Sequence, residues 1–272
     1  MSQNKTEYLS TCPPPLFECT NISICRGGTK VLDSLNLVIP NGEHVAILGP
    51  NGSGKSTLIK VLMKEIYPVQ DEKYHCCKVF GKEQWHVFDL RAHFGIVSND
   101  LQFTFTRSIT GKEVMLSGFF SSIGLFNHKV TSEMEKKVYE VARFLNIESH
   151  LTRCISDLSS GEARRLIIGR ALVHQPQVLI LDEPTSSLDL HALHTLRKYL
   201  RKIAISGVTI ILVTHQIHDI IPEINRIIMM KNGNLFSDGC KDSLLTSTNI
   251  SQLFDIPITV KEENGYYYAS GY

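Results

Sequence analysis

The sequence predicts an α/β protein built around a mainly parallel sheet, and three observations support that fold class. Residues 45–48 (Val-Ala-Ile-Leu) form a short apolar run, as in a strand that is buried on both faces. Runs of similar character recur at 178–181 and 208–213, and an amphipathic helix is expected between them at 190–205. A strand, a glycine-rich loop and a helix, followed by strand, helix and strand, indicate a doubly wound arrangement.

The N-terminal segment is expected to add an antiparallel β portion to this sheet. Residues 1–15 are polar and end in three consecutive prolines, which predicts a flexible tail. Apolar and polar side chains alternate over 17–24 and over 31–39, as in strands with one buried face. A Pro-Asn-Gly sequence then supplies a turn before the buried run at 45–48.

The segment from 98 to 166 is expected to be a helical subdomain inserted into the sheet. Helical spacing of apolar residues predicts helices at 134–145 and 162–173, whereas 117–126 is apolar but irregular. We therefore predict one domain, residues 1–272, with a flexible tail at 1–15, a core at 16–97 and 167–250, the helical subdomain at 98–166 and a C-terminal extension at 251–272.

Composition and charge are those of an ordinary globular protein without a membrane span. The 272 residues are 43% hydrophobic and 20% charged, and 28 basic against 27 acidic residues give no indication of nucleic-acid binding. Seven scattered cysteines without a C-x-x-C motif suit a reduced, intracellular protein. No signal peptide and no run of roughly 18 to 20 apolar residues is found. We expect a cytoplasmic protein, whose membrane part, if it has one, is another chain.

A phosphate-binding loop follows the run at 45–48 and precedes a segment with helical spacing. It fits the pattern G-x-x-x-x-G-K-[ST], in which glycines let backbone N–H groups surround phosphates at a helix N-terminus. Lys55 is expected to reach the β and γ phosphates, and the Ser56 hydroxyl is a candidate Mg²⁺ ligand. The nucleotide-binding residues predicted here are Gly49, Pro50, Asn51, Gly52, Ser53, Gly54, Lys55, Ser56 and Thr57.

Two adjacent carboxylates close the apolar run at 178–181. At the carboxyl end of such a strand Asp182 can hold Mg²⁺ through water. Glu183 projects to the other side and can act as a general base toward the attacking water. Without other motifs, the pair could equally be two acids that end a strand in solvent. The presence of a phosphate loop in the same chain favours a catalytic role.

The order of these motifs resembles the ATP-binding cassette (ABC) family over residues 16–250. Residues 158–162 (Leu-Ser-Ser-Gly-Glu) are similar to the family signature Leu-Ser-Gly-Gly-Gln, and Gly161 lies 21 residues (182 − 161 = 21) before Asp182. Residues 186–189 (Ser-Ser-Leu-Asp) look like the D-loop, and His215 looks like the switch histidine at a strand end. The resemblance implies the α/β phosphate-loop NTPase fold of ABC type.

The resemblance also implies an enzyme that hydrolyses Mg·ATP between paired subunits. Glu183 and His215 would be the catalytic residues, with ATP and Mg²⁺ as cofactors. Ser159 and Gly161 would meet the γ phosphate that is bound by the opposite subunit of a nucleotide-dependent homodimer. Without the other motifs, residues 159–162 would simply be a capped helix start, and His215 an ordinary histidine.

The chain departs from the family pattern at several positions. Ser160 replaces a glycine of the signature and Glu162 replaces its glutamine. The aromatic residue that stacks on adenine falls on Arg26, whose guanidinium can also stack. The glutamine of the Q-loop, a Mg²⁺ contact, falls on Asn99, with Gln102 three residues later as a candidate substitute.

The function expected from the resemblance is an ATP-hydrolysing subunit that drives a separate membrane permease at the cytoplasmic face. The alternative is a stand-alone ABC ATPase that acts on a cytosolic target such as ribosomes or nucleic acid. A non-hydrolysing ATP sensor is disfavoured by the presence of Glu183 and His215. The finer resemblance is to molybdate-transport-like and photorepair-like ABC ATPases. Residues 119, 120, 125 and 126 could dock a permease helix or could simply be the core of the helical subdomain.

Two further groups of residues are interpreted as structural. Residues 75–77 (His-Cys-Cys) lack a second ligand pair at zinc spacing. Residues 266–268 (Tyr-Tyr-Tyr) are interpreted as a packing strand rather than as a stacking platform.

Overall fold

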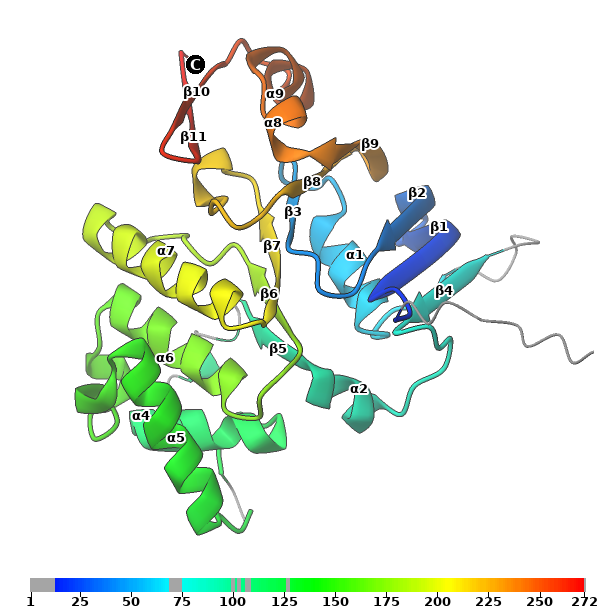
Figure 1. Cartoon of the computed structure of the whole chain (residues 1–272). Helices are drawn as coiled ribbons and strands as arrows, with labels where there is room; N and C mark the ends of the chain where they lie inside the picture. The colour runs from blue at the N-terminus through cyan, green and yellow to red at the C-terminus, as the bar shows by residue number, and fades with distance from the viewer. Residues whose placement is uncertain are drawn as a thin grey trace, which may run out of the picture.

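The centre of the structure is a six-stranded sheet in the order β5-β6-β7-β3-β8-β9 (Figure 1). The computed structural model describes residues 13–68, 75–98, 101, 104–105, 109–125 and 128–271. Five neighbouring strands are parallel and β9 runs antiparallel to β8, which confirms the predicted α/β fold with a parallel core. The strands are β3 (Val45–Leu48), β5 (Phe94–Val97), β6 (Val178–Asp182), β7 (Thr209–Thr214), β8 (Arg226–Lys231) and β9 (Asn234–Cys240).

The parallel strands are apolar throughout because both faces of the sheet are covered. Along β6, Val178 and Ile180 pack into one hydrophobic cluster, while Leu179 and Leu181 pack into another on the opposite face. All four side chains are fully buried. The continuous apolar runs in the sequence therefore reflect two cores that share one sheet.

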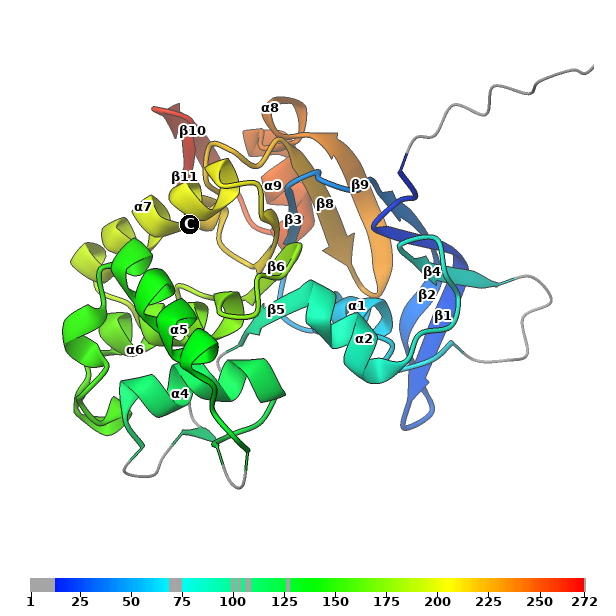
Figure 2. The ribbon, with the colours of Figure 1, turned by 60° about the horizontal axis from the view of Figure 1, so that its bottom comes forward.

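One face of the sheet carries an antiparallel β portion and two helices (Figures 1 and 2). Strands β1 (Phe17–Arg26), β2 (Thr29–Ile39) and β4 (Cys76–Val79) form a separate sheet in the order β2-β1-β4. Their inward residues share a cluster with helix α1 (Lys55–Leu62) and with Leu90 of helix α2 (Val87–His93). The antiparallel N-terminal portion was expected from the alternation at 17–24 and 31–39, whereas β4 was not.

The opposite face carries the helices of the inserted segment and α7 (Figure 2). Helix α6 begins with a capping box between Ser159 and Glu162, and it continues to Leu172 without a break. The boundary expected at residue 166 therefore falls inside one helix, and we propose that the helical subdomain extends to Leu172. The helices are α4 (Gly111–Ser117), α5 (Ser132–Leu145), α6 (Ser160–Leu172) and α7 (Leu190–Ile205), with short 3-10 turns η1 (Gly118–Phe120), η2 (Glu148–His150), η3 (Ile155–Asp157) and η4 (Ile217–Asp219).

The C-terminal segment folds back onto the core. It contains α8 (Lys241–Leu244), α9 (Ser247–Phe254) and a hairpin of β10 (Thr259–Glu263) and β11 (Tyr266–Ser270). The ring of Tyr267 is buried in the core, and its hydroxyl donates to Asp242 Oδ1 at 2.7 Å. Tyr267 therefore has the packing role expected for this strand, whereas Tyr268 is 38% exposed. Within the described ranges, no helix combines the length and apolar character needed to cross a bilayer.

The sheet core should dominate stability. Ile211 is fully buried on β7, whereas Ile205 is 75% exposed at the end of α7. We expect Ile211→Ala to lower the free energy of unfolding by about 2–5 kcal/mol, because it removes buried methyl groups and leaves a cavity. Ile205→Ala, the matched control, should change it by less than about 0.5 kcal/mol. Urea unfolding followed by circular dichroism measures both, and equal losses would contradict this account of the core.

Candidate functional site

The phosphate loop joins the carboxyl end of β3 to the start of α1. Gly54 occupies the N-cap of α1 with φ of +99°, a conformation that favours glycine. No side chain caps this helix and no acidic residue lies in its first turn. The first N–H groups of α1 are therefore not capped by a side chain, and the helix start is suited to an anion such as a phosphate.

The backbone leaves no room for a larger residue at the first glycine of the loop. A Cβ on Gly49 would lie 2.1 Å from the carbonyl oxygen of Met230. Backbone hydrogen bonds also connect the loop to neighbouring segments. Gly233 N donates to Ser53 O at 3.1 Å, an ordinary length for such a bond. Gly49 N donates to the Thr214 carbonyl at 3.4 Å. The loop is thus held in position by β7 and by the β8–β9 turn.

Lys55 places a buried cation in this loop. Its Nζ donates to the carbonyl oxygens of Gly49 at 2.8 Å and Pro50 at 2.9 Å. Burial lowers the pKa of the Lys55 ammonium, while the carboxylates of Glu183 and Asp182 act in the opposite direction. A cation that is partly desolvated beside a helix N-terminus fits a polyphosphate, which would restore the charge interactions that water no longer provides.

Ser56 and Asp182 bring two oxygen ligands together. Ser56 Oγ donates to Asp182 Oδ2 at 3.2 Å, although 126 residues separate them in the sequence. A hydroxyl and a carboxylate are the hard oxygen donors that Mg²⁺ prefers, and Mg²⁺ commonly takes few ligands from the protein. Within the described residues no cluster of three or more His, Cys, Asp or Glu side chains could hold a metal. This donor set therefore fits Mg²⁺ shared with a phosphate ligand.

Glu183 and His215 form a hydrogen-bonded pair beside these residues. Glu183 has φ of +50°, an uncommon conformation for a residue with a side chain, while its N–H continues the sheet ladder to the Val213 carbonyl at 2.9 Å. His215 Nδ1 lies 2.9 Å from Glu183 Oε1, and Gln216 Nε2 lies 3.2 Å from His215 Nε2. With Gln216 as the donor, Nε2 of the imidazole accepts and its Nδ1–H donates to Glu183.

The sequence did not identify Gln216 or Asp219 as part of this site. The Thr214 hydroxyl donates to Asp219 Oδ2 at 2.5 Å, and Gln216 N donates to Thr214 Oγ1 at 3.0 Å. These bonds fix the backbone on both sides of His215. The position of Gln216 directly after the histidine was the available signal, but its role depends on the turn that follows β7.

The signature residues begin helix α6. Ser159 Oγ accepts from Glu162 N at 3.3 Å, and Ser159 N donates to Glu162 Oε2 at 2.8 Å. Hydrogen bonds from the backbone N–H and the side chain of Ser159 to the Glu162 carboxyl lower the pKa of that carboxyl. A Cβ on Gly161 would lie 2.6 Å from Ala192 Cβ, so α6 packs closely against the start of α7. Glutamate at position 162 therefore keeps the capping role that a glutamine would have.

The structure brings together only part of the predicted site. Lys55, Ser56, Asp182, Glu183 and His215 are linked by the contacts described above. The signature residues contact the D-loop of the same chain instead, through Ser160 Oγ to Ser187 O at 3.4 Å. Among the other predicted residues, Asn51 and Gly52 are exposed on the loop and Thr57 is buried in α1. Arg26 is exposed at the end of β1. Asn99 and Gln102 lie outside the described residues.

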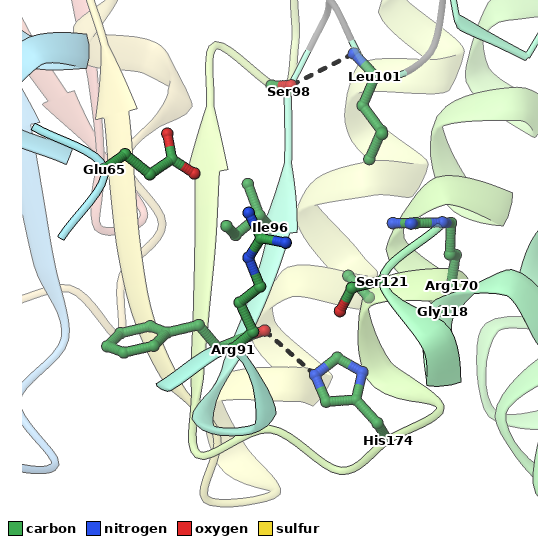
Figure 3. Close-up of a pocket in the computed structure, with 11 residues that line it drawn as sticks. Glu65, Arg91, Ile96, Ser98, Leu101, Gly118, Ser121, Arg170 and His174 are labelled. Carbon is green, nitrogen blue, oxygen red and sulfur yellow. Dashed lines mark hydrogen bonds between the residues drawn. The ribbon is translucent and has the colours of Figure 1, made fainter. Parts of the chain in front are cut away.

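A cavity of about 220 Å³ lies between the sheet core and the helical subdomain (Figure 3). Figure 3 shows Arg91 from α2 and Arg170 from α6 around it, with His174 below them. Arg170 donates to Ser117 Oγ at 3.0 Å and to the Ser122 carbonyl at 2.9 Å. His174 Nε2 lies 3.1 Å from the Phe94 carbonyl. The cavity is therefore lined by two arginines and by the carboxylate of Glu65, with apolar side chains such as Phe94 and Ile96 between them.

Two of the apolar residues considered for docking, Phe119 and Phe120, lie in the sequence between Gly118 and Ser121, which line this cavity. Phe119 and Leu125 are partly buried against the main core, which favours the packing interpretation for these two. The ring of Phe120 stacks on His128 with centroids 4.2 Å apart. Residue 126 lies outside the described residues.

Comparisons with known proteins agree on one family. Residues 32–186, more than half of the chain, match the family described as ABC transporter. The chain is 33% identical to a hemin import ATP-binding protein of Aliivibrio fischeri, over 88% of this chain and 90% of that protein. Its fold is similar to that of cbiO1 from Clostridium perfringens, described as part of an ABC transporter complex, with a TM-score of 0.74, 27% identity, and coverage of 88% and 94%.

A dimeric structure is also among the similar proteins. It is a post-hydrolysis state of the ATP-binding cassette MJ0796 bound to ADP and Pi. The TM-score is 0.66 and the identity 26%, and the match covers 82% of this chain and 98% of that one.

Lys55 should be required for nucleotide binding. We expect Lys55→Ala to weaken ATP binding by about 100-fold, because charge-assisted hydrogen bonds to phosphate are worth about 3 kcal/mol together. Lys60→Ala removes a lysine from the same helix outside the loop and should change affinity less than about twofold. Isothermal titration calorimetry with Mg·ATP measures both variants. Unchanged affinity in Lys55→Ala would show that the loop is not the nucleotide site.

Proposed function

The chain belongs to the ABC transporter family as an ATP-binding and ATP-hydrolysing subunit, and we propose that Lys55, Asp182, Glu183 and His215 carry its reaction. The observation that supports this assignment most directly is the convergence of these side chains at the carboxyl ends of β3, β6 and β7. Ligands bind at this edge in open α/β sheets.

Each residue has a role that follows from its position. Lys55 and the N–H groups at the start of α1 would hold the phosphates and offset the charge that develops during transfer. Glu183 would accept a proton from the attacking water, and the Nδ1–H of His215 would keep the Glu183 carboxylate oriented. Bound Mg²⁺, which we assign to Ser56 and Asp182, would supply charge neutralisation at the phosphates. Arg26 is our proposed adenine contact, and Asn99 and Gln102 remain predicted Mg²⁺ contacts.

We propose that a second copy completes the site. Ser159 and Ser160 at the start of α6 are exposed, although Ser159 also caps the helix through the N–H of Glu162. In our proposal Ser159 and Gly161 approach the γ phosphate held by the partner copy. The dimeric cassette among the similar structures supports a nucleotide-dependent homodimer of this kind.

We also propose that the chain works with a separate membrane permease. The hemin import relative and the transporter complex that contains cbiO1 favour this reading over a stand-alone ATPase acting on a cytosolic target. The cavity lined by Arg91, Arg170 and Glu65 lies at the junction of the two parts of the domain, and the excess of one positive charge among these three side chains would favour a permease segment that carries a carboxylate (Figure 3). A permease segment bound there would contact both the core and the helical subdomain at the cytoplasmic face of the membrane. Its binding would therefore depend on how these two parts are placed relative to each other.

Glu183→Gln tests the catalytic assignment. The amide keeps the shape of the side chain but cannot accept the proton, so ATP turnover should fall by about 10²- to 10⁴-fold. Nucleotide binding should survive because a negative charge beside the γ phosphate is removed. Normal turnover in this variant would remove Glu183 from the mechanism.

The same variant tests the paired site. Glu183→Gln should accumulate as an ATP-bound dimer, since nucleotide contacts hold the two copies together and hydrolysis no longer releases them. Size-exclusion chromatography with light scattering, with and without Mg·ATP, measures the mass. A variant that loses turnover but stays monomeric at saturating ATP would contradict the dimer and leave Glu183 in place.

Arg91→Glu tests the permease contact. Wild-type protein should co-purify with a multi-span membrane protein from detergent-solubilised membranes, and the charge reversal should reduce that recovery by about tenfold or more. Lys136→Glu makes the same charge change on the exposed side of α5 and should retain the partner. Equal recovery by both variants would move the contact elsewhere, and no membrane partner for wild type would favour the cytosolic alternative.

A further inference from the structure

The largest of the described cavities outside the catalytic site lies between α7 and the β10–β11 hairpin. It measures about 620 Å³, within the range of small-molecule sites. Figures 1 and 2 both show the hairpin beside α7, away from the phosphate loop. We call this space the α7–hairpin cavity. None of its lining residues belongs to the motifs that bind or hydrolyse ATP.

The cavity concentrates positive charge in a protein that is otherwise nearly neutral. Four cationic side chains from α7 line it: Arg197, Lys198, Arg201 and Lys202. They occupy positions i, i+1, i+4 and i+5, so each stands one turn from a like charge, an arrangement that destabilises a helix. Two carboxylates oppose them, Glu263 on the wall and Glu223, which pairs with Arg201 at 2.7 Å. The balance is an excess of two positive charges (4 − 2).

One of these cations is held in a buried position. Arg197 packs its guanidinium over the ring of Tyr266 at 4.8 Å and donates to the His218 carbonyl. Its Nε is buried and has no hydrogen-bond partner in the part of the chain that the structure describes. A buried donor without a partner is costly, so an anion at this wall would be stabilised by it.

The hairpin adds two aromatic rings. Tyr266 and Tyr268 both line the cavity, two residues apart on the same face of β11, while Tyr267 points to the core on the other face. Tyr268 is 38% exposed. A half-buried and an exposed tyrosine ring beside cations are suited to a ligand that joins a planar ring to an anionic group.

We propose that the α7–hairpin cavity is a second ligand site for a nucleoside phosphate, which is separate from the ATP site. The α7 cations would bind its phosphate groups, and Tyr268 would stack on its base. The concave shape favours a small molecule over an extended nucleic acid or a flat membrane surface. A ligand there would contact the same Arg197 guanidinium that holds the His218 carbonyl, three residues after His215.

Binding should be measured in the Lys55→Ala background, where the phosphate loop is impaired. Calorimetry with ADP should show a remaining site, whose Kd Lys198→Glu raises by at least about tenfold through charge reversal. Lys136→Glu, an equally exposed lysine on α5, should leave the Kd within about twofold. Tyr268→Ala should raise the Kd for ADP by about fivefold or more, because stacking on one base is worth about 1–3 kcal/mol, but should not change binding of inorganic pyrophosphate.

Three results would overturn the proposal: no remaining site for ADP, equal effects of Lys198→Glu and Lys136→Glu, or pyrophosphate bound as tightly as ADP with Tyr268→Ala neutral. Lys198→Glu and Tyr268→Ala change exposed residues, so melting temperatures should stay near that of the parent. Because turnover of Glu183→Gln is measured independently, failure of this site is distinguishable from failure of the proposed ATPase mechanism.

Discussion

The parallel register of β3, β7 and β6 is the constraint on which the catalytic site depends. Leu48 pairs with Thr214, and Asp182 pairs with Val213, so the three strands end at the same level of the sheet. The residues that follow each strand are therefore neighbours: the phosphate loop after β3, Glu183 after β6 and His215 after β7. The bond from Gly49 N to the Thr214 carbonyl continues this alignment beyond the sheet. A slip of one residue would turn every apolar side chain of a strand to the other face, so the two cores keep the site aligned.

The site is also one in which functional groups depart from ordinary backbone and burial preferences. Glu183 has positive φ and Lys55 is a buried cation among carbonyl oxygens. Such arrangements persist only where the surrounding structure determines them, here through the ladder bond of Glu183 and the packing around the loop. The two arrangements place the Lys55 ammonium and the Glu183 carboxylate where a phosphate and its attacking water would be bound.

The C-terminal hairpin links the surface of α7 to the segment after His215. Arg197 contacts both Tyr266 on β11 and the carbonyl of His218 on η4, and buried Asp219 fixes the start of the same turn through Thr214. The backbone beside His215 is therefore supported by residues outside the family motifs. A ligand in the α7–hairpin cavity would contact Arg197, and through it the backbone at His218, rather than the phosphate loop.

The sequence by itself determined the fold class and the family, and it supplied the prediction of which residues are catalytic. The apolar runs at 45–48 and 178–181 are typical of strands buried on both faces, and the pattern around Lys55 is typical of a phosphate-binding loop. Tertiary structure alone decided which of those residues meet. Ser56 and Asp182 are in contact across 126 residues, whereas Ser159 is occupied within its own helix cap. It also decided that cations on α7 face tyrosines of a distant hairpin. The local sequence pattern predicts which face of a helix or strand is apolar. The neighbours of its polar side chains depend on which distant segments of the chain pack against that element.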